Sequence, residues 1–269
     1  MRLAVFTETL RQHVRQIVYW GVGLGLLAWL IVIMVPDMDG LQQMQEFIES
    51  LPPVILGVLG VGDDIAFMAT PEGFIAMGFF GKSLIMFLAY PIVVGLRITV
   101  AEEHEGTMDM TLSLPIPRWR VVLEKFLAYT VALLLIIALM YVGLWVGVQQ
   151  TGLEINMTRT AEATLNIAPS MMLMLAFTLF VGTVVRQRKY AIGIAVGFLL
   201  YSYAFDVVGS MAIGTVAENL RVISFFKYYN STSVMQNGLI LTNFIGLLAL
   251  AAVLFVGSLW AFERRDISV

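Results

Sequence analysis

Long apolar segments, each ended by charged residues, proline or clusters of small polar residues, recur six times along the chain. About 20 consecutive apolar residues are needed for a helix to cross the hydrocarbon core of a bilayer. The segments therefore predict six membrane-spanning helices, of which the second is interrupted by Lys82, Pro91 and Arg97. The predicted spans are Ile17–Val35, Gly73–Val100, Val121–Val148, Thr164–Val185, Tyr190–Val216 and Leu239–Phe262.

The polar segments between these spans predict the orientation of the chain. Cytoplasmic loops carry an excess of lysine and arginine. Residues 36–72, the first connection, contain seven acidic residues and neither lysine nor arginine. Basic residues gather instead before the first span, in the second and fourth connections and after the last span: Arg2, Arg11, Arg15, Arg118, Arg120, Lys125, Arg186, Arg188, Lys189, Arg264 and Arg265. We therefore predict that both termini are cytoplasmic.

The first 16 residues have a helical pattern of their own. Leu3, Phe6, Leu10 and Val14 recur at intervals of three and four residues, which places them on one side of a helix. Polar residues occupy the other side. This pattern predicts a basic amphipathic helix over residues 1–16 that lies along the membrane interface. The alternative is a simple extension of the first span.

Composition supports a membrane protein and removes several other classes. Of the 269 residues, 59% are hydrophobic and 13% are charged, whereas soluble domains have about 45–50% apolar and about 25% charged residues. A soluble enzyme, a disordered regulator and a secreted disulfide scaffold are excluded. With no cysteine and two histidines we expect no metal site, and a net charge of −3 does not favour nucleic acid. The sequence predicts an all-α polytopic membrane protein whose residues 1–269 form a single transmembrane domain.

The connection over residues 101–120 predicts a short helix outside the membrane. Gly106 permits a turn, Thr107 is a candidate N-cap and Asp109 lies in the first turn, where the helix dipole favours an anion. Pro115 and Pro117 end the helix about two turns later. A short amphipathic helix tied to two spans is suited to docking on another protein and to moving both spans together. The alternative is an ordinary acidic, solvated loop.

This connection also resembles the signature of type-2 ATP-binding-cassette permeases. The matching strings are Glu102-Glu103, Glu105-Gly106-Thr107, Leu112-Ser113-Leu114, Pro115-Ile116, Arg118 and Lys125. Thr70-Pro71-Glu72-Gly73-Phe74 and the six-span layout resemble the same family, so that the similarity covers nearly the whole chain. Two departures, Pro117 in place of serine and Met110-Thr111 in a usually leucine-rich turn, bear on which ATPase docks there.

The resemblance implies a function. In the family this connection is a coupling helix that sits in a cleft of the ATPase subunit, and the residues that would do so here are Glu102, Glu103, Glu105, Gly106, Thr107, Leu112, Pro115 and Arg118. The chain would be a permease subunit of an ATP-driven exporter that works by alternating access in a prokaryotic inner membrane. It would pair with a second permease subunit, identical or different, and ATP and Mg²⁺ would bind the partner ATPase.

The chain itself is not expected to be an enzyme. A phosphate-binding loop needs G-x-x-x-x-G-K-[ST] between a strand and a helix. The nearest string is Gly81-Lys82-Ser83, but Ala76 stands at the first glycine position and the string lies inside a predicted span. An intramembrane protease is disfavoured because the predicted spans contain no histidine. An ion- or proton-coupled secondary transporter and a non-transporting membrane anchor remain as alternatives.

Two charged residues lie within predicted spans. Lys82 is about nine residues, or roughly 14 Å, into the second span, and Asp206 lies in the outer part of the fifth. Ionisable groups at membrane depth are costly, which makes both candidates for a cargo path. The alternatives are a structural Lys82–Asp206 pair or extension of the side chains to the interface. Drugs, peptides, lipids and ions are all carried on this scaffold, and nothing in the spans selects among them.

Overall fold

The computed structural model describes residues 3–52, 55, 65–81, 83–101, 117–185, 187–211 and 216–264. The described residues form helices joined by turns and loops, with no strand among them. Within this part of the chain, five helical segments are long and apolar enough to cross a membrane, and a bent pair of segments makes up to six. The prediction of an all-α polytopic membrane protein is confirmed.

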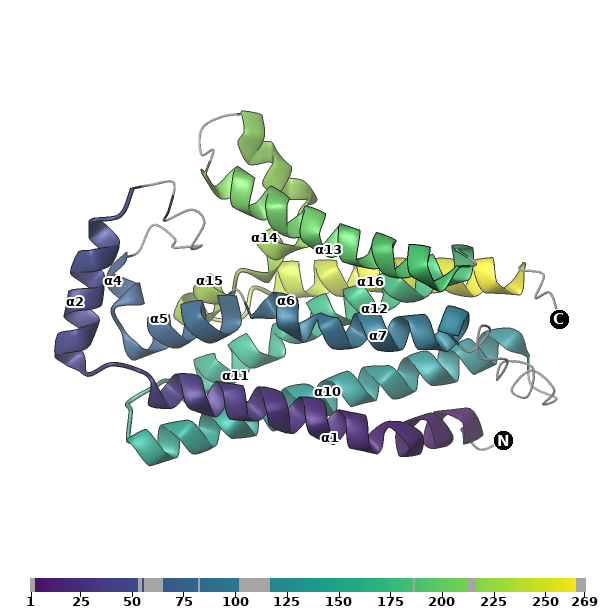
Figure 1. Cartoon of the computed structure of the whole chain (residues 1–269), viewed down its shortest axis with the longest axis horizontal. Coiled ribbons are helices and arrows are strands. Elements are labelled where there is room, and N and C mark those ends of the chain that lie inside the picture. The colour runs from purple at the N-terminus through teal and green to yellow at the C-terminus, as the bar shows by residue number, and fades with distance from the viewer. Residues whose placement is uncertain are drawn as a thin grey trace.

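The straight crossings follow the predicted apolar segments closely. Figure 1 shows them side by side, with the N- and C-termini at the same end. An even number of crossings is needed to bring both termini to one side, which favours counting the bent pair as the sixth span. The straight crossings are α1 (Ala4–Ile33), α10 (Arg118–Thr151), α11 (Met157–Leu165) continued by α12 (Ile167–Val184), α13 (Arg188–Met211) and α16 (Leu241–Glu263).

The second crossing is broken, as its irregular sequence suggests. Its two halves, Pro71–Gly81 and Leu84–Thr99, meet at an angle of 43°. Short α-helical pieces alternate with two π-helical turns, and π-turns leave backbone groups out of the regular ladder. The pieces are α5 (Pro71–Ile75), the π-turn η1 (Ala76–Gly81), α6 (Leu84–Phe87), α7 (Ala89–Leu96) and the π-turn η2 (Arg97–Ala101).

The predicted separate interfacial helix over residues 1–16 is not present as an element of its own. From Ala4 onward these residues belong to α1, which continues without a break to Ile33. Neither proline nor glycine occurs between Ala4 and Trp20 to interrupt the helix. The alternative considered for this region, an extension of the first span, is therefore the one that the structure adopts.

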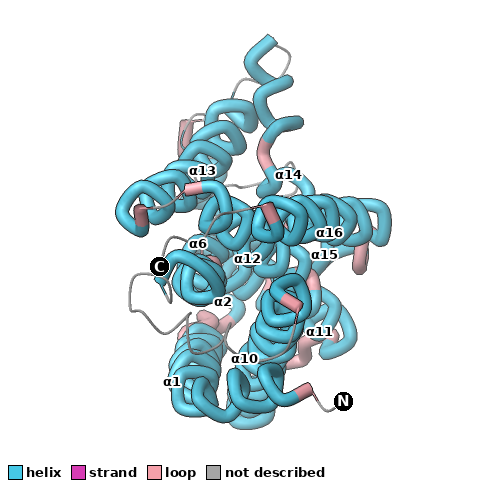
Figure 2. The backbone as a smooth tube through the Cα atoms, turned by 90° about the vertical axis from the view of Figure 1, so that its right-hand side faces the viewer, coloured by secondary structure: helices cyan, strands magenta, loops and turns pink. Residues whose placement is uncertain are grey.

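Helix α12 forms the centre of the bundle. Of the apolar window of α11–α12, 78% is buried, against 17–44% for the windows of the other straight crossings. Figure 2 shows α12 surrounded by α10, α13, α16 and the broken crossing. Hydropathy does not single out α12, because the apolar windows of α10 and α16 are more hydrophobic and less buried, so the central position is a property of the packing.

Helices α1 and α10 form a closely packed pair along one side of the bundle (Figure 1). Glycines at the contact allow the two backbones to approach closely, as is common between membrane helices. A Cβ atom added at Gly143 would lie 2.1 Å from the carbonyl oxygen of Gly25, and one at Gly21 would lie 2.4 Å from a side-chain carbon of Leu139. The two backbones are therefore too close for larger residues at Gly143.

Shorter elements gather at the end of the bundle away from the termini (Figure 1). Asp37 caps α2 by accepting a hydrogen bond from the backbone N–H of Gly40. The 3₁₀-helix η3 packs beside α13. These elements are α2 (Met38–Glu49), α4 (Ile65–Met68), η3 (Val216–Ile223), α14 (Phe225–Tyr229) and α15 (Ser231–Asn237).

Candidate functional site

The residues predicted to contact an ATPase lie around the connection between the second and third crossings. Arg118 is the first residue of α10 and is exposed. The other predicted contact residues lie outside the described part of the chain: Glu102, Glu103, Glu105, Gly106, Thr107, Leu112 and Pro115. The structure does describe both flanks, the π-turn η2 before residue 102 and the first turns of α10 after residue 116.

On the α10 side, Glu124 holds the beginning of α1. Its side chain is 2% exposed, and its Oε2 atom accepts hydrogen bonds from the backbone N–H groups of Val5 (3.1 Å) and Phe6 (3.2 Å). The first N–H groups of a helix lack intrahelical partners, and a carboxylate there also interacts favourably with the helix dipole. Leu3, at the N-cap of α1, has no polar side chain. The cap of α1 is therefore supplied by another helix.

The other oxygen of Glu124 binds a cation. Oε1 accepts a hydrogen bond from Nε of Arg120 at 2.9 Å, and Arg120 lies one turn earlier on α10. A buried carboxylate is costly unless its oxygens are paired. The arginine together with the two N–H groups gives Glu124 partners on both oxygens. The carboxylate consequently links the start of α10 to the start of α1.

On the η2 side, Arg97 contacts α1 through His13. The Nη1 atom of Arg97 lies 3.1 Å from Nε2 of His13, and the hydroxyl of Tyr129 lies 3.3 Å from the same nitrogen. His13 Nδ1 lies 2.8 Å from the carbonyl oxygen of Thr9. Because a carbonyl only accepts, we assign the proton to Nδ1, so that Nε2 accepts from both Arg97 and Tyr129.

These two sets of contacts both involve α1 and α10, and we call them together the polar junction, defined as His13, Arg97, Arg120, Glu124 and Tyr129. It connects three elements: α1, the end of the second crossing and the start of the third. Both flanks of residues 102–116 are thereby attached to α1. The polar junction contains hydrogen bonds and charged groups and no nucleophile. Its contacts would allow a movement of residues 102–116 to be passed on to α1.

Asp206, predicted as a possible cargo residue, has a partner in the structure. Its Oδ1 atom accepts a hydrogen bond from Nε of Arg221 at 3.0 Å, which joins α13 to η3. The Arg221 side chain packs against Gly209 of the same α13, where a Cβ atom would lie 2.5 Å from its Cγ. The predicted Lys82 lies outside the described residues, and a structural pair for Asp206 is formed with Arg221.

A second buried contact involves the first half of the broken crossing, Pro71–Gly81. The Tyr229 hydroxyl donates to the carbonyl oxygen of Phe80 in the π-turn η1 at 2.9 Å, and Asn166 Nδ2 donates to the Tyr229 carbonyl oxygen. Burial raises the pKa of Tyr229, so that its hydroxyl remains protonated and acts as a donor. The contact satisfies a carbonyl group within a π-turn.

Sequence reasoning missed Glu124, His13 and Tyr229 as structural links. A local signal existed only for Glu124, because Arg120 and Glu124 have the i,i+4 spacing of a helical ion pair. The contact from Glu124 to Val5 spans 119 residues, and the contact from Tyr229 to Phe80 spans 149. No local sequence pattern predicts contacts between residues so far apart in the chain.

Comparison with known families agrees with this architecture. The family model described as ABC-2 family transporter protein matches residues 3–267. The search of curated proteins found no match. The matched region includes all six crossings, both flanks of the 102–116 connection and the polar junction. The chain belongs to the ABC-2 family of transporter proteins.

Proposed function

We propose that this ABC-2 membrane component is the permease subunit of an ATP-driven exporter, powered by a separate ATPase that docks on residues 101–120. Membership of the family supports the permease role. The sequence of the connection supports the docking surface, and the lack of a complete phosphate-binding string in the sequence supports hydrolysis on another subunit. ATP and Mg²⁺ would bind that partner.

The observation that carries this proposal is the attachment of both flanks of residues 102–116 to one helix. Arg97 binds His13 on the flank before the connection, and Glu124 binds the N-terminus of α1 on the flank after it. A push on the connection would therefore displace the broken crossing, α10 and α1 together. Alternating access follows if that movement opens one end of the pathway as it closes the other.

Two permease subunits are included in the proposal. Six crossings supply half of the transport pathway in this family, and a second subunit, identical or different, would supply the other half. The Asp206–Arg221 pair favours a structural role for Asp206 over contact with cargo.

The docking step can be tested on the complex of this chain with an ATPase that co-purifies with it. The test variant combines Gly106→Trp, which fills the predicted turn, with Arg118→Glu, which reverses a charge at the start of α10. We expect ATP hydrolysis in proteoliposomes to fall to the rate of the ATPase alone, with the ATPase no longer co-purifying.

The matched control is Arg188→Glu, because Arg188 is an exposed arginine that also begins a crossing at the end of the bundle where the termini lie. We expect this control to retain coupled hydrolysis. Full coupling in the Gly106→Trp/Arg118→Glu variant would disprove docking at this connection. Cargo movement driven by a proton gradient without any ATPase would instead identify a secondary transporter.

A further inference from the structure

Arg97, at the end of the second crossing, binds a histidine rather than a carboxylate. Its Nη1 atom lies 3.1 Å from Nε2 of His13, and no carboxylate of the described residues forms an ion pair with it. The guanidinium group can only donate, so Nε2 has to accept. The contact therefore exists only while the imidazole ring is neutral and keeps a lone pair on Nε2.

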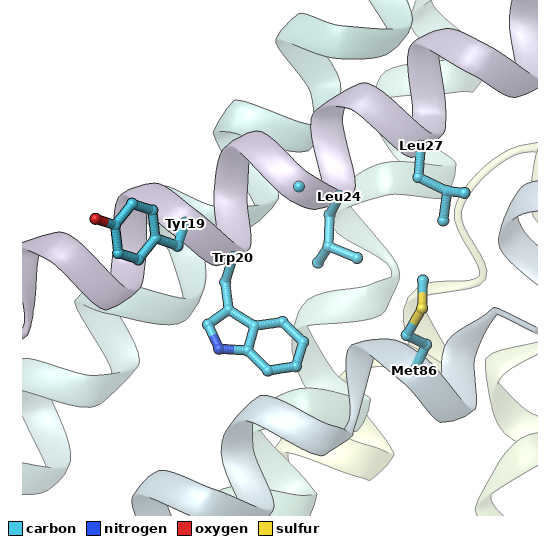
Figure 3. A pocket seen from close by; sticks show the side chains of 6 residues that line it. Tyr19, Trp20, Leu24, Leu27 and Met86 are labelled. Carbon is cyan, nitrogen blue, oxygen red and sulfur yellow. The ribbon is translucent and has the colours of Figure 1, made fainter.

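The rest of the interface between α1 and the second crossing is apolar and loosely packed. His13 and Trp20 are seven residues apart, which places them on the same side of α1. Figure 3 shows this side of α1, with Trp20 and Leu27, facing Met86 of α6, and the groove there has a volume of about 390 Å³. The Trp20 ring also contacts Tyr90 of α7, with 5.8 Å between the ring centroids. Close packing therefore does not replace the bond to Arg97 when that bond is lost.

Helix α1 is attached to α10 much more firmly. The two helices pack along most of their length, and the backbones of Gly25 and Gly143 lie in contact. Glu124 of α10 also binds the first N–H groups of α1. None of these contacts involves the imidazole ring. Loss of the bond between His13 and Arg97 would free the second crossing from α1 and leave α1 on α10.

A second proton on the ring would break this bond selectively. Nδ1 lies 2.8 Å from the carbonyl oxygen of Thr9 and already carries a proton, so the next proton has to bind Nε2. The Tyr129 hydroxyl, 3.3 Å from Nε2, can turn and accept from the new N–H group. Arg97 cannot accept, and its positive charge would lie beside a second positive charge. Protonation of His13 therefore expels Arg97 and retains Tyr129.

The other charged groups around His13 do not supply a new anionic partner. On α1, Glu8 is exposed and accepts a hydrogen bond within its own helix. On α10, Glu124 is bound by Arg120 and by the start of α1, and Lys125 is a buried cation one turn before Tyr129. The acidic residues that follow η2 lie outside the described part of the chain.

We propose that His13 is a pH-sensitive latch between α1 and the second crossing. The neutral ring holds Arg97, and protonation of Nε2 releases it while the ring stays on α10 through Tyr129. Histidine is the side chain whose charge changes between about pH 5 and 8. The consequence for transport rests on the proposed function: with one flank of residues 102–116 released, ATP hydrolysis would be coupled less well at acid pH.

The protonation state of the ring can be read by nitrogen NMR of the full chain with labelled histidine. The chain has two histidines, and the signal that is missing from the His13→Gln variant belongs to His13. We expect the neutral ring to carry its proton on Nδ1, and acid to add a second proton on Nε2. A neutral ring with its proton on Nε2 would overturn the latch, because Arg97 would then have no acceptor.

Release of the second crossing can be measured as a distance between spin labels. The chain has no cysteine, so labels can be placed on pairs of introduced cysteines. Val14→Cys with Val93→Cys reports on α1 and α7, and Val14→Cys with Leu127→Cys is the reference pair on α1 and α10, all at exposed positions. We expect the first distance to lengthen as the pH falls, with the midpoint of the His13 titration, and the reference distance to stay constant.

Two variants test the chemistry of the latch. His13→Gln places an amide oxygen, which accepts but takes no proton in this range, near the position of Nε2, and should keep the short distance at every pH. Arg97→Gln provides an amide that can donate to the neutral ring and accept from the protonated ring, and should also remove the pH dependence. Arg188→Gln, at an exposed arginine of α13, is the control that should respond like the parent.

A distance that does not change with pH, or that changes equally in the parent and in His13→Gln, overturns the latch whatever the chain transports. If His13→Gln does not fold, a pH response that persists in Arg97→Gln has the same meaning. On the complex with the ATPase, coupled hydrolysis at acid pH should be lower in the parent than in His13→Gln. A changed distance with equal hydrolysis would confirm the latch and contradict the coupling route proposed above.

Discussion

Tyr229 donates its hydroxyl to the carbonyl oxygen of Phe80, 149 positions earlier in the chain, at a distance of 2.9 Å. Phe80 belongs to the π-turn η1, and both side chains are buried. The contact joins the broken second crossing to the short helix α14 at the end of the bundle opposite the termini. A conformational change that reshapes this end has to break or move this bond.

Replacing Tyr229 by phenylalanine removes this hydroxyl and little else. The Phe80 carbonyl then loses a buried donor, and we expect a loss of about 1–3 kcal/mol in the free energy of unfolding. Tyr228→Phe is the matched control, because the Tyr228 hydroxyl donates to the Val222 carbonyl at an exposed position. Chemical unfolding in detergent measures both variants, and equal losses would contradict the role assigned to Tyr229.

Glu124→Gln tests the polar junction. Glutamine has one acceptor oxygen where glutamate has two, so it can serve either Arg120 or the N–H groups of Val5 and Phe6 but not both. We expect faster hydrogen exchange at Val5 and Phe6, destabilisation by about 0.5–2 kcal/mol, and weaker coupling of ATP hydrolysis with the ATPase still bound.

Glu154→Gln is the control for that experiment, because Glu154 is exposed in the loop that precedes α11. It should change neither hydrogen exchange at α1 nor coupling. Unchanged exchange at Val5 and Phe6 in the Glu124→Gln variant would mean that the junction does not hold the start of α1.

Gly143→Ala tests the contact between α1 and α10. The added methyl group would lie 2.1 Å from the carbonyl oxygen of Gly25, a backbone atom that moves only if the helices separate. We expect destabilisation by about 1–3 kcal/mol. At Gly193, where no described atom lies within 4 Å, alanine should instead stabilise α13 by up to about 1 kcal/mol through its higher helix propensity. Thermal unfolding shows whether the two changes have opposite signs.

The Asp206–Arg221 pair is tested by exchanging its charges. The two side chains are 24% and 33% exposed, so that solvent screens the pair and its contribution to stability is below about 1 kcal/mol. Asp206→Arg or Arg221→Asp alone should each lower the unfolding temperature, and the double exchange should restore part of the loss. If Asp206→Asn abolishes transport while Arg221→Gln does not, Asp206 acts on cargo instead.

The crossings could be predicted from sequence because the signal is local. A run of apolar residues long enough to span a bilayer is visible at every crossing, and the breaks in the second one are announced by Lys82, Pro91 and Arg97. The continuity of α1 from Ala4 to Ile33 was harder to predict from the sequence. The stripe of Leu3, Phe6, Leu10 and Val14 fits an interfacial helix and a span extension equally well, and the choice depends on what packs against it.

The partners of charged groups likewise depend on tertiary packing and could not be predicted from the local sequence. Among the described residues Asp206 pairs with Arg221, which η3 brings alongside α13, and Lys82, the partner considered from the sequence, lies outside them. Glu124 reaches the start of α1 because α1 and α10 run side by side in the bundle. Neither pairing follows from spacing along the chain.

By itself, the sequence determined the class of protein and the apolar crossings, because chain length and hydrophobicity set what a bilayer accepts at each crossing. It also indicated the family, through the strings of residues 101–120. The tertiary structure decided which residues bind across those crossings: Glu124 to the start of α1, Arg97 to His13, and Tyr229 to Phe80. A buried polar group needs a partner, but the identity of that partner depends on which helices pack side by side.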